Sequence, residues 1–144
     1  DMAYMLGLFH NAGIPLLMQR FSDYPKIISE SYMLNEHRIV DSENKQYESN
    51  HAVVSFYAAR SWKLPDLLCQ VIAKHHNAAD IFTEKDRTDP DEKYLLGILK
   101  MGEHLAGLFR SIGNNEDDLE WQQIEEGVLD YLGLSQFDYD DLVV

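Results

Sequence analysis

The side chains of this chain that could carry chemistry are mainly its six histidines. The 144 residues contain no Gly-rich phosphate loop, no Cys-x-x-Cys pair, no GxSxG elbow and no HExxH zinc motif. Four of the histidines stand where a predicted helix begins or ends: His10, His51, His75 and His76. Imidazoles delivered by three helices can converge on one metal ion or on a phosphate.

A plainer interpretation competes with a metal site. A histidine on an apolar helix face is more often a hydrogen-bonded core residue, and residue type alone favours this interpretation. His75 continues the apolar face of its helix, so we expect it to point inward. His76 follows about 100° further round, so both rings can aim at one point only if the helix bends. We interpret His37 and His104 as surface or packing residues.

Helical patterns run through nearly the whole chain and must position these histidines. Residues 2–12 are apolar on all sides until His10, which predicts a helix that is buried all round. Gly13 can end that helix in a left-handed conformation, and Pro15 can open the next one. Further helices are predicted over residues 23–34, 35–48, 51–62 (capped by Asn50), 65–76, 91–112 and 121–131 (ended by Gly133). Ser135 and Asp138 resemble a capping box that opens a short terminal helix.

Between these helices, residues 77–92 form one long polar stretch that we expect to be a loop. In the helix over 91–112, Leu105 lies in the middle of the apolar stripe and Glu103 lies about 160° away from it. Glu103 would therefore reach a site only if this helix were buried on both sides. Trp62 is expected to fill the core at a corner before Pro65. With no strand pattern and no internal boundary, the sequence predicts one compact, all-α, multi-helix domain over residues 1–144.

The composition excludes several classes of protein. The chain has 12 basic and 25 acidic residues, and residues 111–144 hold ten acidic and no basic side chains. Nucleic acid and anionic membranes are poor partners for the acidic helical end, residues 115–144, which is better explained as a solubilising face than as a surface for a basic partner. The single cysteine, Cys69, excludes an internal disulfide and favours a reducing, cytoplasmic compartment. We expect its side chain to be a buried, inert thiol. No apolar run approaches the roughly 20 residues of a membrane span, and we expect no signal peptide.

The order of short motifs resembles the HDOD domain, the HD-related output domain of bacterial signalling proteins, which is related to metal-dependent HD phosphohydrolases. The resemblance extends from residue 1 to about residue 133. The matching pieces are Gly7–Gly13, Glu43, Asn50–Val54, Trp62–Pro65, Val71–His76 and Gly102–Ala106.

The resemblance implies an HD-like helical core and a regulatory role without established catalysis. It also implies that the chain is the C-terminal part of a longer module, whose N-terminal helical half would cover part of the first helix. Where active HD enzymes have a His-Asp pair, this chain has His10-Asn11, and where HD-GYP enzymes have a Lys it has Ile14. A neutral amide is a poor ligand for a hard divalent ion. Glu43 either accepts a hydrogen bond from a neighbouring helix end or is solvated.

We therefore expect a non-catalytic signal-transduction domain that acts through protein contacts, with a protein or fused signalling domain as its partner. No catalytic residue, cofactor or metal is expected. The alternatives are an HD-type phosphohydrolase or phosphodiesterase and a sensor of nucleotides or other small molecules. A metal, if one binds, would be held by His10, His51, His75 and Glu103, and the degenerate pocket would comprise His10, Asn11, His51, His75 and His76.

Overall fold

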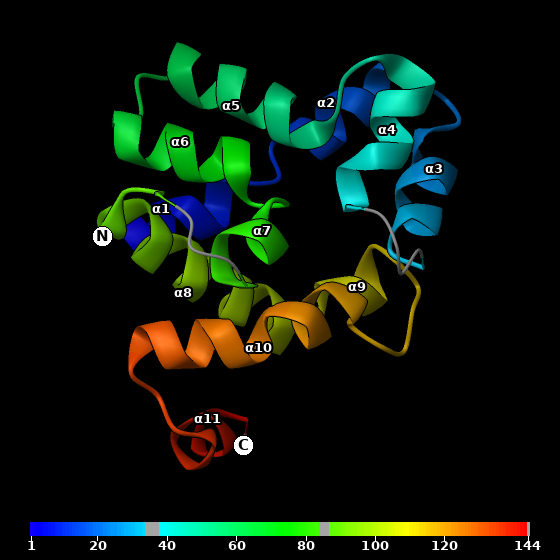
Figure 1. The fold of residues 1–144 in the computed structure, drawn as a ribbon. Coiled ribbons are helices and arrows are strands. Elements are labelled where there is room, and N and C mark those ends of the chain that lie inside the picture. The colour runs from blue at the N-terminus through cyan, green and yellow to red at the C-terminus, as the bar shows by residue number, and fades with distance from the viewer. Residues whose placement is uncertain (34–37, 84–86, 144) are drawn as a thin grey trace.

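The computed structural model describes residues 1–33, 38–83 and 87–143, and every regular element within these ranges is a helix (Figure 1). The predicted all-α class is therefore confirmed. The helices are α1 (Met2–Phe9), α2 (Gly13–Arg20), α3 (Tyr24–Ser31), α4 (Ile39–Tyr47), α5 (His51–Ser61), α6 (Asp66–Lys74), α7 (Ala78–Thr83), α8 (Pro90–Ala106), α9 (Leu108–Ser111), α10 (Leu119–Leu132) and α11 (Gln136–Leu142).

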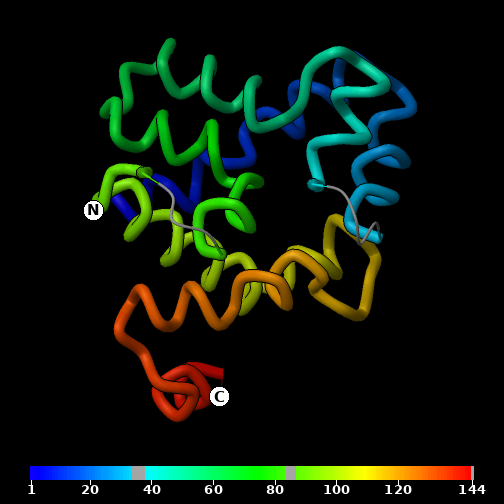
Figure 2. Tube along the Cα trace, viewed as in Figure 1, coloured from blue at the N-terminus to red at the C-terminus, as the bar shows by residue number. Residues whose placement is uncertain are grey.

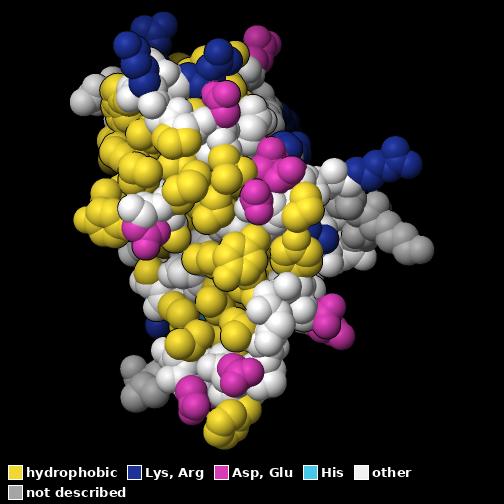
Figure 3. Space-filling model, turned by 90° about the vertical axis from the view of Figure 1, so that its left-hand side faces the viewer, with side chains coloured by type: hydrophobic (Ala, Val, Ile, Leu, Met, Phe, Trp, Pro, Cys, Tyr) yellow, Lys and Arg dark blue, Asp and Glu magenta, His cyan; other side chains and the backbone are white. Residues whose placement is uncertain are grey.

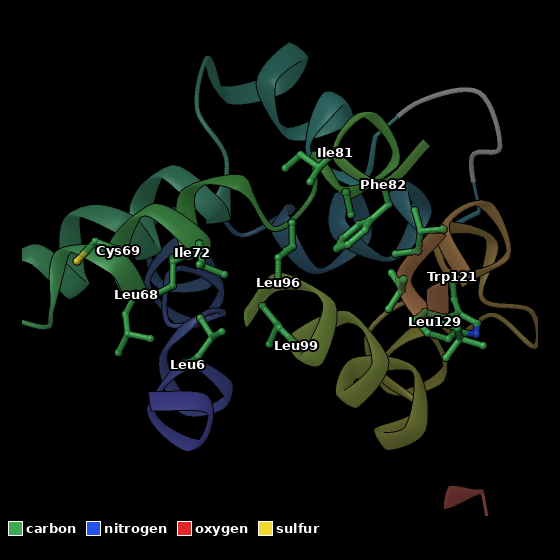
Figure 4. Packing of buried hydrophobic residues seen from close by; sticks show 14 of the residues in the cluster. Leu6, Leu68, Cys69, Ile72, Ile81, Phe82, Leu96, Leu99, Trp121 and Leu129 are labelled. Atoms are coloured by element: carbon green, nitrogen blue, oxygen red, sulfur yellow. The ribbon is translucent and has the colours of Figure 1, made fainter. Parts of the chain in front are cut away.

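Two apolar clusters hold these helices together. The larger cluster joins α1, α5, α6, α7, α8, α10 and α11, and Figure 4 shows Leu6, Leu96 and Leu99 pointing into it. The smaller cluster joins α2, α3, α4 and α9 through Leu17, Ile28 and Phe109 among others. The Cα trace shows α2, α3 and α4 grouped to one side of the molecule (Figure 2). The helix ends that carry the histidines lie between the two clusters.

Local capping explains several of the helix ends. The side chain of Asn50 accepts a hydrogen bond from the backbone N–H of Val53, so α5 begins at His51 as predicted. Gly133 ends α10 in a left-handed conformation, with φ of 69°. Ser135 and Asp138 form the predicted capping box of α11.

Gly13 has a different role from the predicted one. It is the first residue of α2, and its φ is not positive. A Cβ atom at this position would lie 2.4 Å from the backbone oxygen of His51. Glycine therefore permits α2 to pack closely against the start of α5, and the expected left-handed C-cap is wrong.

The predicted loop over residues 77–92 contains a helix. Helix α7 follows the turn after α6 and buries Ile81 and Phe82 in the larger cluster. The polar residues around it concealed these two apolar side chains, which are too few to set up a helical period. Helix α8 begins at Pro90, with Asp89 as its cap, and residues 84–86 lie outside the described part of the chain.

The predicted helix over residues 91–112 is broken by Gly107, whose φ is 71°. Its predicted apolar face was also wrong, because Leu105 is 41% exposed and the buried side chains are those of Leu96, Leu99 and Lys100. Helix α8 packs against α1 and α6 as well as against α10. Apolar residues consequently occur round much of this helix, and their stripe does not identify the inner face. Because α8 is covered on more than one side, Glu103 can reach the site, as the sequence analysis required.

The surface carries more large apolar side chains than predicted. Helix α1 is not buried all round, because Tyr4 and Leu8 are exposed. Trp62 is 53% exposed and contacts Phe9, so it does not fill the core. Figure 3 shows hydrophobic side chains gathered over the end of the molecule where α1 begins. Among the described helices, none combines the length and the hydrophobicity of a membrane span.

Candidate functional site

The structure brings four histidines together from three helix ends. Helix α6 ends at Lys74, so His75 and His76 lie in the turn that follows and both rings point into one pocket. One ring nitrogen from each of His51, His75 and His76 lies within 4.8 Å of the other two. The ring of His10 lies 5.3 Å from that of His75. The rings of His75 and His76 can therefore point to one place because α6 ends before them, and no bend within the helix is needed.

The four imidazoles share one orientation. In each ring Nδ1 lies against an oxygen atom and Nε2 is directed into the pocket. Metal-binding histidines are held in the same way. The acceptors are Gly7 O for His10 (2.9 Å), Glu43 Oε2 for His51 (2.7 Å), Ile72 O for His75 (2.6 Å) and Glu120 Oε2 for His76 (2.7 Å). His51 Nε2 lies 2.9 Å from His76 Nε2, so one of these two nitrogens carries a proton and donates it to the other.

Glu43 connects the pocket to the smaller apolar cluster. Its side chain is completely buried and accepts hydrogen bonds from the backbone N–H of His51 and from the hydroxyl of Tyr24, both at 2.8 Å. Burial raises the pKa of Tyr24 far above its usual value, and the neighbouring Glu43 raises it further. Of the two alternatives for Glu43, contact with a neighbouring helix end is confirmed. The carboxylate also stabilises the N-terminus of α5.

Lys100 is a central residue of the pocket that the sequence analysis missed. It is 3% exposed, its Nζ lies 2.5 Å from Glu103 Oε2, and it also forms an ion pair with Glu120. Burial alone would lower the pKa of Lys100, but these two carboxylates raise it above its usual range. Burial would likewise raise the pKa of Glu103, but Lys100 and His10 hold it far below its usual value. Lys100 and Glu103 are therefore both charged at neutral pH.

Unpaired polar atoms converge on the same place. Five buried side-chain polar atoms of the described residues lack a hydrogen bond, and four of them belong to the pocket residues His10, His75, Lys100 and Glu103. Three of these four take part in ion pairs, which leaves His75 Nε2 without a partner. Buried polar atoms without partners are uncommon in folded proteins and indicate room for a bound group or a water. The five atoms are His10 Nε2, Asn11 Oδ1, His75 Nε2, Lys100 Nζ and Glu103 Oε1.

His104 packs outside the pocket, as predicted. Its Nδ1 lies 2.8 Å from Asp118 Oδ2, and its ring stacks on Phe109 and Trp121. His37 lies outside the described residues.

The comparison with protein families now bears on this geometry. A family model for the HDOD domain matches residues 1–78. The chain belongs to the HDOD domain family. No curated protein and no solved structure matches it. The HDOD match covers the four pocket histidines, Asn11 and Glu43, whereas the ion-pair residues Lys100, Glu103 and Glu120 lie beyond it.

The HDOD pocket has the donors for one metal ion but not for two. Burial lowers the pKa of His75 and His76, so both rings are neutral, as imidazole ligands must be. Imidazole suits zinc, iron and nickel, and His51, His75 and His76 would hold such an ion. A pair of hard ions needs bridging carboxylates, but Asn11 is neutral and the charge of Glu103 is offset by Lys100. The expectation that no metal binds stays a prediction.

Proposed function

We propose that this HDOD domain is a regulatory module without catalytic activity, which acts through contacts with a protein partner or a fused signalling domain. The observation that carries the proposal is the ammonium group of Lys100, which pairs with both Glu103 and Glu120 inside the pocket. Metal-dependent hydrolysis of phosphodiesters commonly uses two ions held close together by anionic ligands. Here two of the three carboxylates that contact the imidazoles, Glu103 and Glu120, already have Lys100 as a counter-ion, and Glu43 is held by His51 and Tyr24.

The side chain of Asn11 supports the same conclusion. Its amide oxygen is neutral and has no hydrogen-bond partner, so it cannot offset the charge of a second ion. A single ion bound by the imidazoles would supply Lewis acidity. Such a reaction would further use a free carboxylate and a free cation, whereas the described Lys100, Glu103 and Glu120 are paired with one another.

The apolar surface supports a role in protein contact. Tyr4 is 69% exposed and Leu8 is 57% exposed, and both lie on α1 next to the helix end that carries His10. Large apolar side chains grouped on a surface are typical of protein interfaces. With one cysteine, which is buried, the chain suits a reducing compartment, and we place its function in the cytoplasm.

Metal analysis together with a hydrolysis assay tests this proposal. The protein and its His51→Ala variant are incubated with Mn²⁺, Fe²⁺, Ni²⁺ or Zn²⁺, the bound metal is counted, and turnover of bis(p-nitrophenyl) phosphate is measured. We expect no more than one ion per chain and no turnover above that of His51→Ala. Two bound ions, with hydrolysis that is lost in His51→Ala, would show that the domain is an HD-type phosphodiesterase.

A further inference from the structure

Helix α11 is attached to the rest of the domain through few side chains. Figure 1 shows it at one end of the molecule, beyond α10. Tyr139 is its buried residue, whereas Phe137 is 72% exposed and Leu142 is 54% exposed. The closely packed helix pairs of the described chain do not include α11. A single aromatic side chain therefore holds this helix in place.

Tyr139 packs against a row of stacked rings. The centroid of its ring lies 5.7 Å from that of Trp121 and 6.4 Å from that of His104. The rings of His104 and Trp121 stack on each other, with centroids 5.0 Å apart. Aromatic pairs of this kind contribute about 0.5–1.5 kcal/mol beyond the area that they bury. Tyr139 thus connects α11 to both α8 and α10.

The charges at this contact oppose the attachment. Two grooves, of about 490 and 300 Å³, open between α10 and α11, and no Lys or Arg lines either of them. Glu125 of α10 lines both grooves, Asp140 of α11 lines the larger one, and α11 carries three aspartates and no basic residue. Burial raises the pKa of Tyr139, and the charges of Glu125 and Asp118 raise it further. Repulsion between these acidic side chains weakens the hold of Tyr139.

The rings that hold α11 are adjacent in sequence to the ion pairs of the pocket. His104 directly follows Glu103 on α8. In the same way, Trp121 directly follows Glu120 on α10. Both carboxylates pair with the ammonium group of Lys100. A change in these ion pairs is therefore transmitted to the rings against which α11 packs.

We propose that α11 is a detachable arm, which leaves the aromatic row when the ion pairs of the pocket weaken. Tyr139 holds the attached state, and the repulsion between the acidic side chains of α10 and α11 favours detachment. A free helix of seven residues is unstable in water, so the detached arm unfolds locally. The use of this arm as the output of the regulatory module rests on the proposed function, whereas detachment and its dependence on the pocket do not.

Amide hydrogen exchange of the whole chain measures detachment, because the N–H of Tyr139 bonds to Ser135 O while α11 is formed. We expect the amides of α11 to exchange at least a hundredfold faster than those of α10, with no dependence on low concentrations of urea. Tyr139→Ala should accelerate the exchange of α11 tenfold or more. Phe137→Ala is the matched control, because this ring lies on the same helix but is exposed, and it should change the rate less than twofold.

The repulsion predicts how exchange depends on salt. An increase in NaCl from about 0.05 M to about 0.5 M should slow the exchange of α11 threefold or more, because salt screens the acidic side chains from one another. Glu125→Gln should slow the exchange at low salt and reduce the effect of added salt, because it removes a charge that faces the arm.

Glu120→Gln tests the link to the pocket, because it removes one of the two carboxylates that pair with Lys100. We expect the amides of α11 to exchange at least threefold faster in this variant. Gly13→Ala is the control for a general loss of stability, because it disturbs the distant contact of α2 with α5 and should leave the exchange of α11 unchanged.

The outcomes separate the parts of this proposal. Equal exchange of α11 and α10, no effect of Tyr139→Ala, or faster exchange at high salt would overturn the detachable arm. No effect of Glu120→Gln, or an equal effect of Gly13→Ala, would overturn its dependence on the pocket. Phosphodiester turnover would instead contradict the proposed function and leave these exchange results standing.

Discussion

Removal of the Lys100 ammonium is the sharpest test of how the pocket is built. Lys100→Met keeps most of the volume and the apolar stem but leaves Glu103 and Glu120 without their counter-ion. The side chain of Lys100 is 2% exposed, so water cannot replace it readily. Loss of one partner from a buried ion pair typically costs about 3–5 kcal/mol. We expect a loss in this range in the free energy of unfolding at pH 7.

Urea denaturation followed by circular dichroism measures this loss. For a denaturant slope of about 2 kcal/mol per molar urea, the midpoint should fall by about 2 M. Lys26→Met is the matched control, because Lys26 pairs with Glu30 at 3.9 Å on α3 but its side chain is 77% exposed. Exposed pairs of this kind contribute only about 0–1 kcal/mol.

The charge explanation makes two further demands on Lys100→Met. The deficit relative to the unmodified protein should be smaller at pH 5 than at pH 7, because a buried carboxylate without its counter-ion takes up a proton more readily. Lys100→Met combined with Glu103→Gln should recover part of the lost stability, because the substitution removes one unpaired charge. A loss below about 1 kcal/mol at pH 7, or no recovery in the double variant, would refute the view that this ion pair organises the pocket.

Three other predictions follow from the packing and the charges. The folded-state pKa values of His75 and His76 lie below the ordinary value, so the stability that these neutral rings contribute is fully present above about pH 6.5. Below that pH, the free energy of unfolding should fall by up to about 1.4 kcal/mol per pH unit for each ring. Equal stability in urea at pH 7.5 and pH 5.5 would contradict this. Gly13→Ala should destabilise by about 1–3 kcal/mol in thermal or urea unfolding, because its Cβ would press on the backbone of His51; an unchanged midpoint would exclude the close approach. Trp62→Ala should cost less than about 1.5 kcal/mol rather than the roughly 3–5 of a core aromatic, and a larger loss would restore Trp62 to the core.

Features set by short segments were predictable from the sequence. The cap at Asn50, the helix end at Gly133 and the box formed by Ser135 and Asp138 depend on residues within four positions of one another, and all were confirmed. The inward orientation of His75 also followed from the period of one helix. Such features need no knowledge of how the helices pack together.

Features set by packing were not predictable in the same way. Glu120 reaches Lys100 from another helix, 20 positions along the chain, so no spacing rule connects them. The apolar stripe of α8 did not identify its buried face, because other helices cover this helix on more than one side. Gly13 was expected to end a helix but permits a close approach of two helices, and Gly107, to which no role was assigned, breaks the helix predicted over residues 91–112. A glycine alone does not show which of these it does.

The position of the histidine pocket between two separate apolar clusters has a mechanical consequence. Glu43 ties Tyr24 of the smaller cluster to His51, and Lys100 ties α8 to α10 in the larger one. Polar links of this kind depend on occupancy and protonation, whereas apolar packing does not. The pocket thus adds a polar link, through Glu43 and His51, to the packing of α2 against α5 that already joins the two clusters, and only this added link responds to protonation.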